Sequence, residues 1–163
     1  LNEYFEVMVD VLFQMGGTLD KYLGDGMMAL FGVPKDDPLC CDAAVRCGLR
    51  MQQALRSLNR VRQARGESPI GIGVGINYGD VVWGPLGSRK TMDYTVVGDV
   101  VNTASRLCGV AEPNQVIVTQ SVIDALSGSY RHEELPPKTV KGKAEALRVY
   151  RVIADLDASG TNT

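Results

Sequence analysis

The chain has 163 residues, of which 45% are hydrophobic and 22% are charged, and its formal net charge is −2. This composition is ordinary for one globular domain, and the slightly acidic balance argues against nucleic-acid binding driven by the overall field. No apolar run reaches the ~18 residues that a membrane span needs, and no signal peptide is recognised. A cytoplasmic setting is therefore expected.

The four cysteines do not form a familiar metal or redox pattern. They lack the spacing of zinc ligands, and the adjacent Cys40 and Cys41 suit neither a disulfide scaffold nor a C-x-x-C redox site. We therefore expect reduced thiols with structural roles.

A helix followed by a tight hairpin opens the chain. Apolar residues at helical spacing predict a helix over 1–15, closed by glycines at 16 and 17. Two short apolar runs, 18–23 and 27–31, are joined by Gly24, Asp25 and Gly26, which is turn chemistry for a β-hairpin. Asp25 is expected at the tip with its carboxylate pointing outward. By itself such a residue is most simply a turn former.

A long helix and a glycine-rich strand follow. Pro38 is expected to open a helix from residue 39 to about residue 65, with a solvated arginine face. Segment 70–79 alternates glycine with aliphatic residues, which predicts a strand with one bare face that another backbone can approach closely. It does not match the dinucleotide-binding fingerprint, because its third glycine is misplaced and no helix follows.

The second half alternates short strands with helices. Asn102 and Arg106 lie four residues apart on one face of a predicted helix, 100–110. They are either a solvated pair or two groups that reach into a shared cleft. Lone His132 is expected at the surface. The remaining predicted elements are strands at 81–84, 94–97, 115–118 and 147–152, a basic loop at 87–90 and a short helix at 121–126.

Four segments, taken together, closely resemble the class III nucleotidyl cyclases, the adenylate and guanylate cyclase catalytic domain. They are Asp-Lys-Tyr-Leu-Gly-Asp at 20–25, Gly-Ile-Asn-Tyr-Gly-Asp at 75–80, the long run from Asp93 to Arg106, and Val-Lys-Gly-Lys at 140–143. They occur in the family's order and at matching spacings, and the run at 93–106 is the most specific. The resemblance is closest to bacterial adenylate cyclases.

The resemblance implies an α+β fold with a ferredoxin-like βαββαβ sheet and helices on one face. The catalytic domain would cover 1–153, followed by a flexible tail at 154–163. The family's first strand, which carries its first metal-binding aspartate, has no counterpart in this sequence. The resemblance therefore implies an N-terminally incomplete domain that is inactive alone, or else a naturally degenerate homologue.

The resemblance also implies roles for individual residues. Asp25 is similar to an aspartate that binds two divalent metal ions, Mg or Mn. Arg106 is similar to the arginine that stabilises charge on the α-phosphate, and Asn102 to the residue that orients the ribose. The implied substrate-binding residues are Lys21 and Thr95 for the adenine and Lys141 for the triphosphate. The match is looser at Arg89 and Lys90, and Thr91 stands where many bacterial relatives have arginine.

The implied activity is conversion of ATP to 3′,5′-cyclic AMP and pyrophosphate by two-metal in-line attack of the ribose 3′-hydroxyl. The implied partner is a second copy of the chain in a head-to-tail homodimer with shared active sites, under regulatory domains upstream. One alternative is a non-catalytic domain for nucleotide binding or dimerisation. Guanylate cyclase is another, although it usually has a carboxylate at the position of Lys21. A diguanylate cyclase is disfavoured because its Gly-Gly-Asp-Glu-Phe motif is missing.

Overall fold

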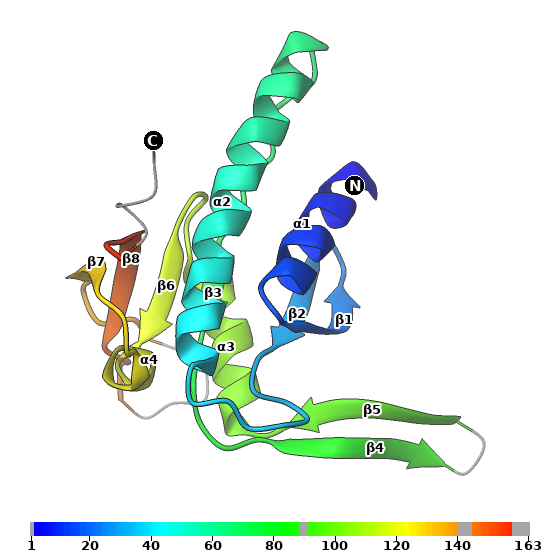
Figure 1. Cartoon of the computed structure of the whole chain (residues 1–163), viewed down its shortest axis with the longest axis vertical. Helices are drawn as coiled ribbons and strands as arrows, with labels where there is room; N and C mark the ends of the chain where they lie inside the picture. The colour runs from blue at the N-terminus through cyan, green and yellow to red at the C-terminus, as the bar shows by residue number, and fades with distance from the viewer. Residues whose placement is uncertain (1, 89–90, 140–144, 158–163) are drawn as a thin grey trace.

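The computed structural model describes residues 2–88, 91–139 and 145–157 of the chain. The helices are α1 (Asn2–Gln14), α2 (Cys40–Ala64), α3 (Asp99–Val110) and α4 (Gln120–Ala125). The strands are β1 (Thr18–Leu23), β2 (Gly26–Leu30), β3 (Val74–Ile76), β4 (Val82–Ser88), β5 (Thr91–Val97), β6 (Val116–Thr119), β7 (Tyr130–Glu134) and β8 (Val149–Asp155). Figure 1 shows α2 running through the centre of the molecule, with α1 and its hairpin on one side and β6, β7 and β8 on the other.

The predicted helix cap and hairpin at the start of the chain are confirmed. Gly16 has a positive φ of 78°, its N–H donates to the Phe13 carbonyl, and the N–H of Gly17 donates to the Leu12 carbonyl at 3.0 Å. This pair of bonds is the Schellman arrangement that ends many helices. β1 and β2 pair antiparallel up to Leu23 and Gly26, so Gly24 and Asp25 form a two-residue turn.

The long helix α2 builds the core between two layers. Its buried Leu55 and Leu58 pack in one cluster with Met8 and Leu12 of α1. Further along, Gly48 lets Val116 of β6 approach so closely that an added Cβ would lie 3.1 Å from its Cγ1. The predicted helix over 39–65 is thereby confirmed within one residue at each end.

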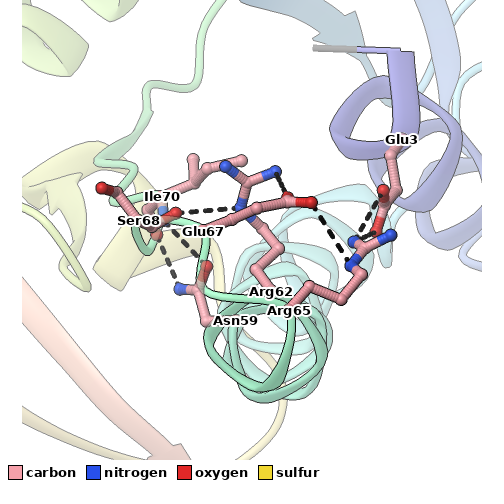
Figure 2. Close-up of polar contacts among 7 residues, drawn as sticks. All are labelled: Glu3, Asn59, Arg62, Arg65, Glu67, Ser68 and Ile70. Carbon is pink, nitrogen blue, oxygen red and sulfur yellow. Dashed lines mark hydrogen bonds and ion pairs between the residues drawn. The ribbon is translucent and has the colours of Figure 1, made fainter.

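The turn after α2 is held by polar contacts (Figure 2). The side chain of Asn59 pairs with both backbone groups of Ile70: its Nδ2 donates to the carbonyl at 2.8 Å, and its Oδ1 accepts from the N–H at 2.8 Å. Exposed ion pairs surround this contact and join Arg62 and Arg65 to Glu67, and Arg65 to Glu3 of α1. Two of the arginines expected to be solvated are therefore ion-paired.

Four strands form a mixed sheet in the order β3-β6-β8-β7. β3 lies parallel to β6, whereas β8 lies antiparallel to both β6 and β7. The strand predicted over 70–79 is shorter than expected, because only Val74 to Ile76 pair with β6. Before them, the Ile72 carbonyl accepts instead from the N–H of Asn114 in the loop before β6. The hairpin β1–β2 forms a sheet of its own.

The bare glycine face of β3 is confirmed, and α3 covers it. A Cβ added at Gly75 would lie 2.5 Å from the backbone nitrogen of Cys108, and one added at Gly73 would lie 2.7 Å from the Cβ of Ala111. Val74 points the other way, toward Gly48 of α2. The α+β class is confirmed, and β3 has a helix on each of its faces, a detail that the expected one-sided arrangement does not include.

β4 and β5 form an arm that extends away from the body of the molecule (Figure 1). Their pairing runs from Val82 and Val97 out to Ser88 and Thr91, so both strands are longer than predicted. The expected loop at 87–90 is shorter than its polar composition indicated, because Gly87 and Ser88 still pair across the arm.

The C-terminal part adds one strand that the sequence did not predict. β7 is mostly exposed and polar, so it has no apolar alternation, and its pairing with β8 defines it. His132 lies there, exposed as expected. β8 runs to Asp155 and so includes the first two residues of the expected tail, whereas 158–163 lie outside the described residues. Within the described parts of the chain, no helix has the length and apolar character needed to cross a membrane.

Candidate active site

The β1–β2 hairpin presents Lys21 and Asp25 to solvent. The register shifts between Leu19 and Lys21, and this irregularity at Asp20 separates the environments of two neighbouring side chains. The Asp20 side chain is only 2% exposed, whereas the Lys21 side chain is 45% exposed, with its Nζ 3.5 Å from Asp20 Oδ2. Asp25 is exposed in the turn. The hairpin therefore carries a cation and a carboxylate on one short rigid element.

Asp25 lies near residues from two helices. Burial raises the pKa of Tyr4 in α1, and the charge of Asp25 raises it further. Burial also raises the pKa of the Cys108 thiol in α3, with a smaller contribution from the same carboxylate. The hairpin tip is thus within electrostatic reach of the first turn of α1 and the last turn of α3.

α3 presents Asn102 and Arg106 on its outer side. Thr103 and Leu107 are buried and fix the rotation of the helix, which leaves Asn102 exposed and Arg106 half-buried. Among the residues that the structure describes, neither side chain has a hydrogen-bond or ion-pair partner. Their spacing places both on one side of the helix, and this geometry fits either a solvated pair or two groups that reach into a shared cleft.

The remaining predicted site residues are only partly placed. Thr95 lies on β5, paired with Gly84, and Thr91 begins the same strand. Lys141, like Arg89 and Lys90, lies outside the described residues. Within the described ranges, no hydrogen bond or ion pair joins Asp25 to the two polar side chains of α3.

The described residues do not form a complete metal site. No group of three or more His, Cys, Asp or Glu side chains in the described ranges could hold an ion. Asp25 offers one exposed carboxylate, which is the hard oxygen ligand that magnesium and manganese prefer. Asp25 therefore fits such an ion in the type of ligand, and it would be one ligand of the predicted site.

Sequence reasoning missed two polar side chains that organise loops. Asp42 in α2 is buried, and its carboxylate accepts from the N–H groups of Ser127 and Gly128 and from the Tyr130 hydroxyl. Burial raises the pKa of Asp42, but these hydrogen bonds outweigh burial and lower it. The second residue is Asn77, which contacts α3, β6 and α4. The segment 75–80 that contains Asn77 contributes to the family resemblance, but the sequence alone assigns no role to this residue.

The comparisons with known proteins identify the family. The family model described as the adenylate and guanylate cyclase catalytic domain matches residues 1–154. The chain belongs to this family.

The curated relatives of this cyclase domain include bacterial adenylate cyclases. The adenylate cyclase of Anabaena cylindrica is 38% identical over 94% of the chain, and adenylate cyclase 1 of Rhizobium meliloti is 29% identical over 99% of it. The matched region is 32% of the first relative and 24% of the second. The chain thus spans no more than a third of either protein.

Solved structures confirm the cyclase fold and include both kinds of cyclase. The guanylyl cyclase Cya2 is 34% identical with a TM-score of 0.85, covering 95% of this chain and 79% of that one. The adenylyl cyclase CyaB from P. aeruginosa is 27% identical with a TM-score of 0.85, covering 94% and 80%. A rhodopsin-guanylyl cyclase core with converted specificity, in complex with ATPαS, is 27% identical with a TM-score of 0.83, covering 94% and 80%. The same fold therefore occurs in both adenylyl and guanylyl cyclases.

Proposed function

We propose that the chain is the catalytic domain of an adenylate cyclase that converts ATP to 3′,5′-cyclic AMP and pyrophosphate. The observation that carries the proposal is the outer face of α3, where Asn102 and Arg106 have no protein partner in the described residues. Family membership supports the reaction class, and Lys21 supports the choice of base.

Arg106 and Asn102 divide the work on the reacting centre. The guanidinium offers a planar fork of N–H donors to the non-bridging oxygens of the α-phosphate, where charge develops as the 3′-oxygen attacks. The Asn102 amide can donate and accept, and so orients the ribose and its 3′-hydroxyl for in-line attack. Lys141 would neutralise the triphosphate as a point charge.

Asp25 would bind one or both of two divalent cations. When bound, such ions lower the pKa of the attacking hydroxyl and offset charge on the leaving pyrophosphate. Asp25 is the single carboxylate that this proposal uses, so further ligands come from substrate phosphates and from a second carboxylate. We infer that this carboxylate lies on a further strand of a longer protein. The separation of the β1–β2 sheet from the β3-β6-β8-β7 sheet in the described residues supports that inference.

Base choice follows from hydrogen-bond chemistry. A lysine donor at position 21 and a threonine hydroxyl at position 95 suit adenine, whereas guanine presents the opposite pattern. The exposure of Lys21 agrees with a role in ligand binding, and the ion pair with Asp20 helps to fix its direction.

The active sites would be shared between two copies of the chain in a head-to-tail homodimer. Lys21 and Asp25 lie on the same hairpin, yet they would act at opposite ends of one nucleotide. A second protomer resolves this conflict, because Asp25 of one copy then faces Arg106 and Asn102 of the other.

The test is a comparison of initial rates on ATP and GTP with manganese, using the full-length protein. We expect faster turnover of ATP, and Lys21→Glu should erode the preference because an acceptor replaces a donor. Equal rates, or faster turnover of GTP, would contradict the proposal, and the second result would identify a guanylate cyclase like Cya2. In the same assay, residues 1–163 alone should form no cyclic nucleotide, because we infer that the second metal-binding carboxylate lies outside them.

A further inference from the structure

The side chain of Asn77 links the end of β3 to α3 and β6. Its Nδ2 donates to the Val100 carbonyl in the first turn of α3 at 3.2 Å, and its Oδ1 accepts from the Thr119 hydroxyl at 2.8 Å. A carbonyl can only accept, so the amide must direct its Nδ2 toward Val100. The two ends of the amide therefore have distinct partners on two elements.

Ser121 of α4 completes this contact. Its hydroxyl lies 3.3 Å from Asn77 Oδ1 and 2.9 Å from the Thr119 hydroxyl, and it is 3.1 Å from the Tyr78 carbonyl as a donor. The Ser121 hydroxyl has one proton and can donate to only one of these three atoms, so the Thr119 hydroxyl is the donor that holds the Asn77 amide on the side away from α3. The contact with Thr119 therefore fixes the orientation of the amide group that donates to α3.

The start of α3 has no capping side chain. The residue before the helix, Gly98, has a φ of 141° and no side chain that could cap it. Besides the Asn77 bond, Gly79 packs against Val100, because an added Cβ there would lie 2.7 Å from Val100 Cγ2. Asn77 therefore contacts the backbone of Val100, and Gly79 contacts its side chain.

These contacts at Val100 lie on the same helix as two predicted site residues. Val100 precedes Asn102 by two residues and Arg106 by six, on one continuous helix. Since a helix advances about 1.5 Å per residue as a rigid rod, a shift or rotation at Val100 moves both side chains together. We propose that Asn77 is a positioning residue, which sets the placement of Asn102 and Arg106 against the substrate without touching it. This proposal rests on the proposed function.

The first experiment replaces only the donor end of the amide. In full-length Asn77→Asp, the carboxylate can still accept from Thr119 and Ser121 but cannot donate to the Val100 carbonyl. We expect kcat for ATP to fall by about 10- to 100-fold, with a much smaller change in KM, because misplacement affects the transition state most. Unchanged kcat in this variant would overturn the proposal.

Asn59→Asp is the matched control. Asn59 also donates to a backbone carbonyl, that of Ile70, at the opposite end of the same segment. The substitution removes the same type of hydrogen bond, so we expect a similar drop in melting temperature and an unchanged kcat. Equal losses of kcat in the two variants would indicate a purely structural effect and overturn the proposal.

A second pair of variants covers the case in which Asn77→Asp does not fold. Thr119→Ser keeps the hydroxyl that holds the Asn77 amide, whereas Thr119→Val removes it with little change in shape. We expect kcat to fall in the valine variant and to be largely preserved in the serine variant. Equal kcat in both would contradict the proposal.

Coupling to Arg106 separates this proposal from the proposed function. In an Arg106→Ala background, Asn77→Asp should lower the residual kcat much less than it does in the wild type. An undiminished effect there would overturn the positioning role. Full activity of Arg106→Ala alone would instead overturn the proposed function, and this result is distinct from the others.

Discussion

An asparagine side chain joins each end of segment 70–79 to a different helix. Asn59 joins the first end to α2, and Asn77 joins the other end to α3. At the first end, Asn59 of α2 pairs with Ile70 amid ion pairs such as Arg65–Glu3, so polar groups are satisfied within the chain (Figure 2). At the other end, Asn77 binds α3, whose Asn102 and Arg106 side chains have no hydrogen-bond or ion-pair partner among the described residues. The first end therefore contributes to the stability of the fold, whereas the second supports the helix that, under the proposed function, presents Asn102 and Arg106 to the substrate.

The largest expected effect is the difference in activity between a variant of Arg106 in α3 and a variant of Arg65 next to α2. Arg106→Ala should lower kcat by roughly 10²–10³, because it removes a donor that acts on charge in the transition state. Arg65→Ala breaks two exposed ion pairs, with Glu3 and Glu67, and each should cost less than ~1 kcal/mol in unfolding free energy, with unchanged activity. Steady-state rates and urea denaturation of both variants measure this contrast. Similar kcat values for the two variants would contradict a catalytic role that Arg106 has and Arg65 lacks.

Packing between β3 and α3 gives the next effect. The Cβ of Gly75→Ala would lie 2.5 Å from the backbone nitrogen of Cys108, so α3 must move away from the sheet. We expect a loss toward the upper end of about 1–3 kcal/mol in unfolding free energy, together with reduced kcat. Gly84→Ala on β4 is the control, because nothing lies within 4 Å of its added Cβ. Denaturation midpoints that match between the two variants would show that this contact is not tight.

A smaller effect, which depends on pH, is expected at Asp42, away from both ends of the segment. Burial raises its pKa, but hydrogen bonds from Gly128, Ser127 and Tyr130 lower it overall. A carboxyl with a lowered pKa stabilises the fold above its ordinary pKa of about 3.9, and this contribution is lost as the pH falls through the folded-state pKa. Asp42→Asn should therefore cost about 1–2 kcal/mol at pH 7, and the difference from the wild type should shrink below about pH 4. Urea denaturation across this range tests it, and a difference that does not change with pH would be evidence against the account.

The sequence predicted the parts of the fold that depend on local chemistry. The glycine cap of α1, the hairpin turn at Asp25 and the bare face of β3 all follow from residues adjacent in the chain. β7 and the full length of the β4–β5 arm were missed because strand pairing, and not apolar alternation, defines them.

The candidate site likewise contains residues that local sequence predicts and residues that it does not. Asn102 and Arg106 share a face because of their helical spacing, which the sequence shows directly. Asn77 and Asp42 could not be assigned roles, because their partners lie far along the chain: Val100 is 23 residues from Asn77, and Gly128 is 86 residues from Asp42. Such contacts become visible only once the sheet and helices are assembled.

Under the proposed function, the hairpin tip of one protomer and the outer face of α3 of the other form one active site. The most direct measurement mixes full-length Asp25→Ala with full-length Arg106→Ala, each nearly inactive alone, and assays cyclic AMP after subunit exchange. Random pairing would give heterodimers with one intact and one doubly damaged site, so about a quarter of wild-type activity should return. If no activity returns although exchange is verified, shared sites built from Asp25 and Arg106 are contradicted.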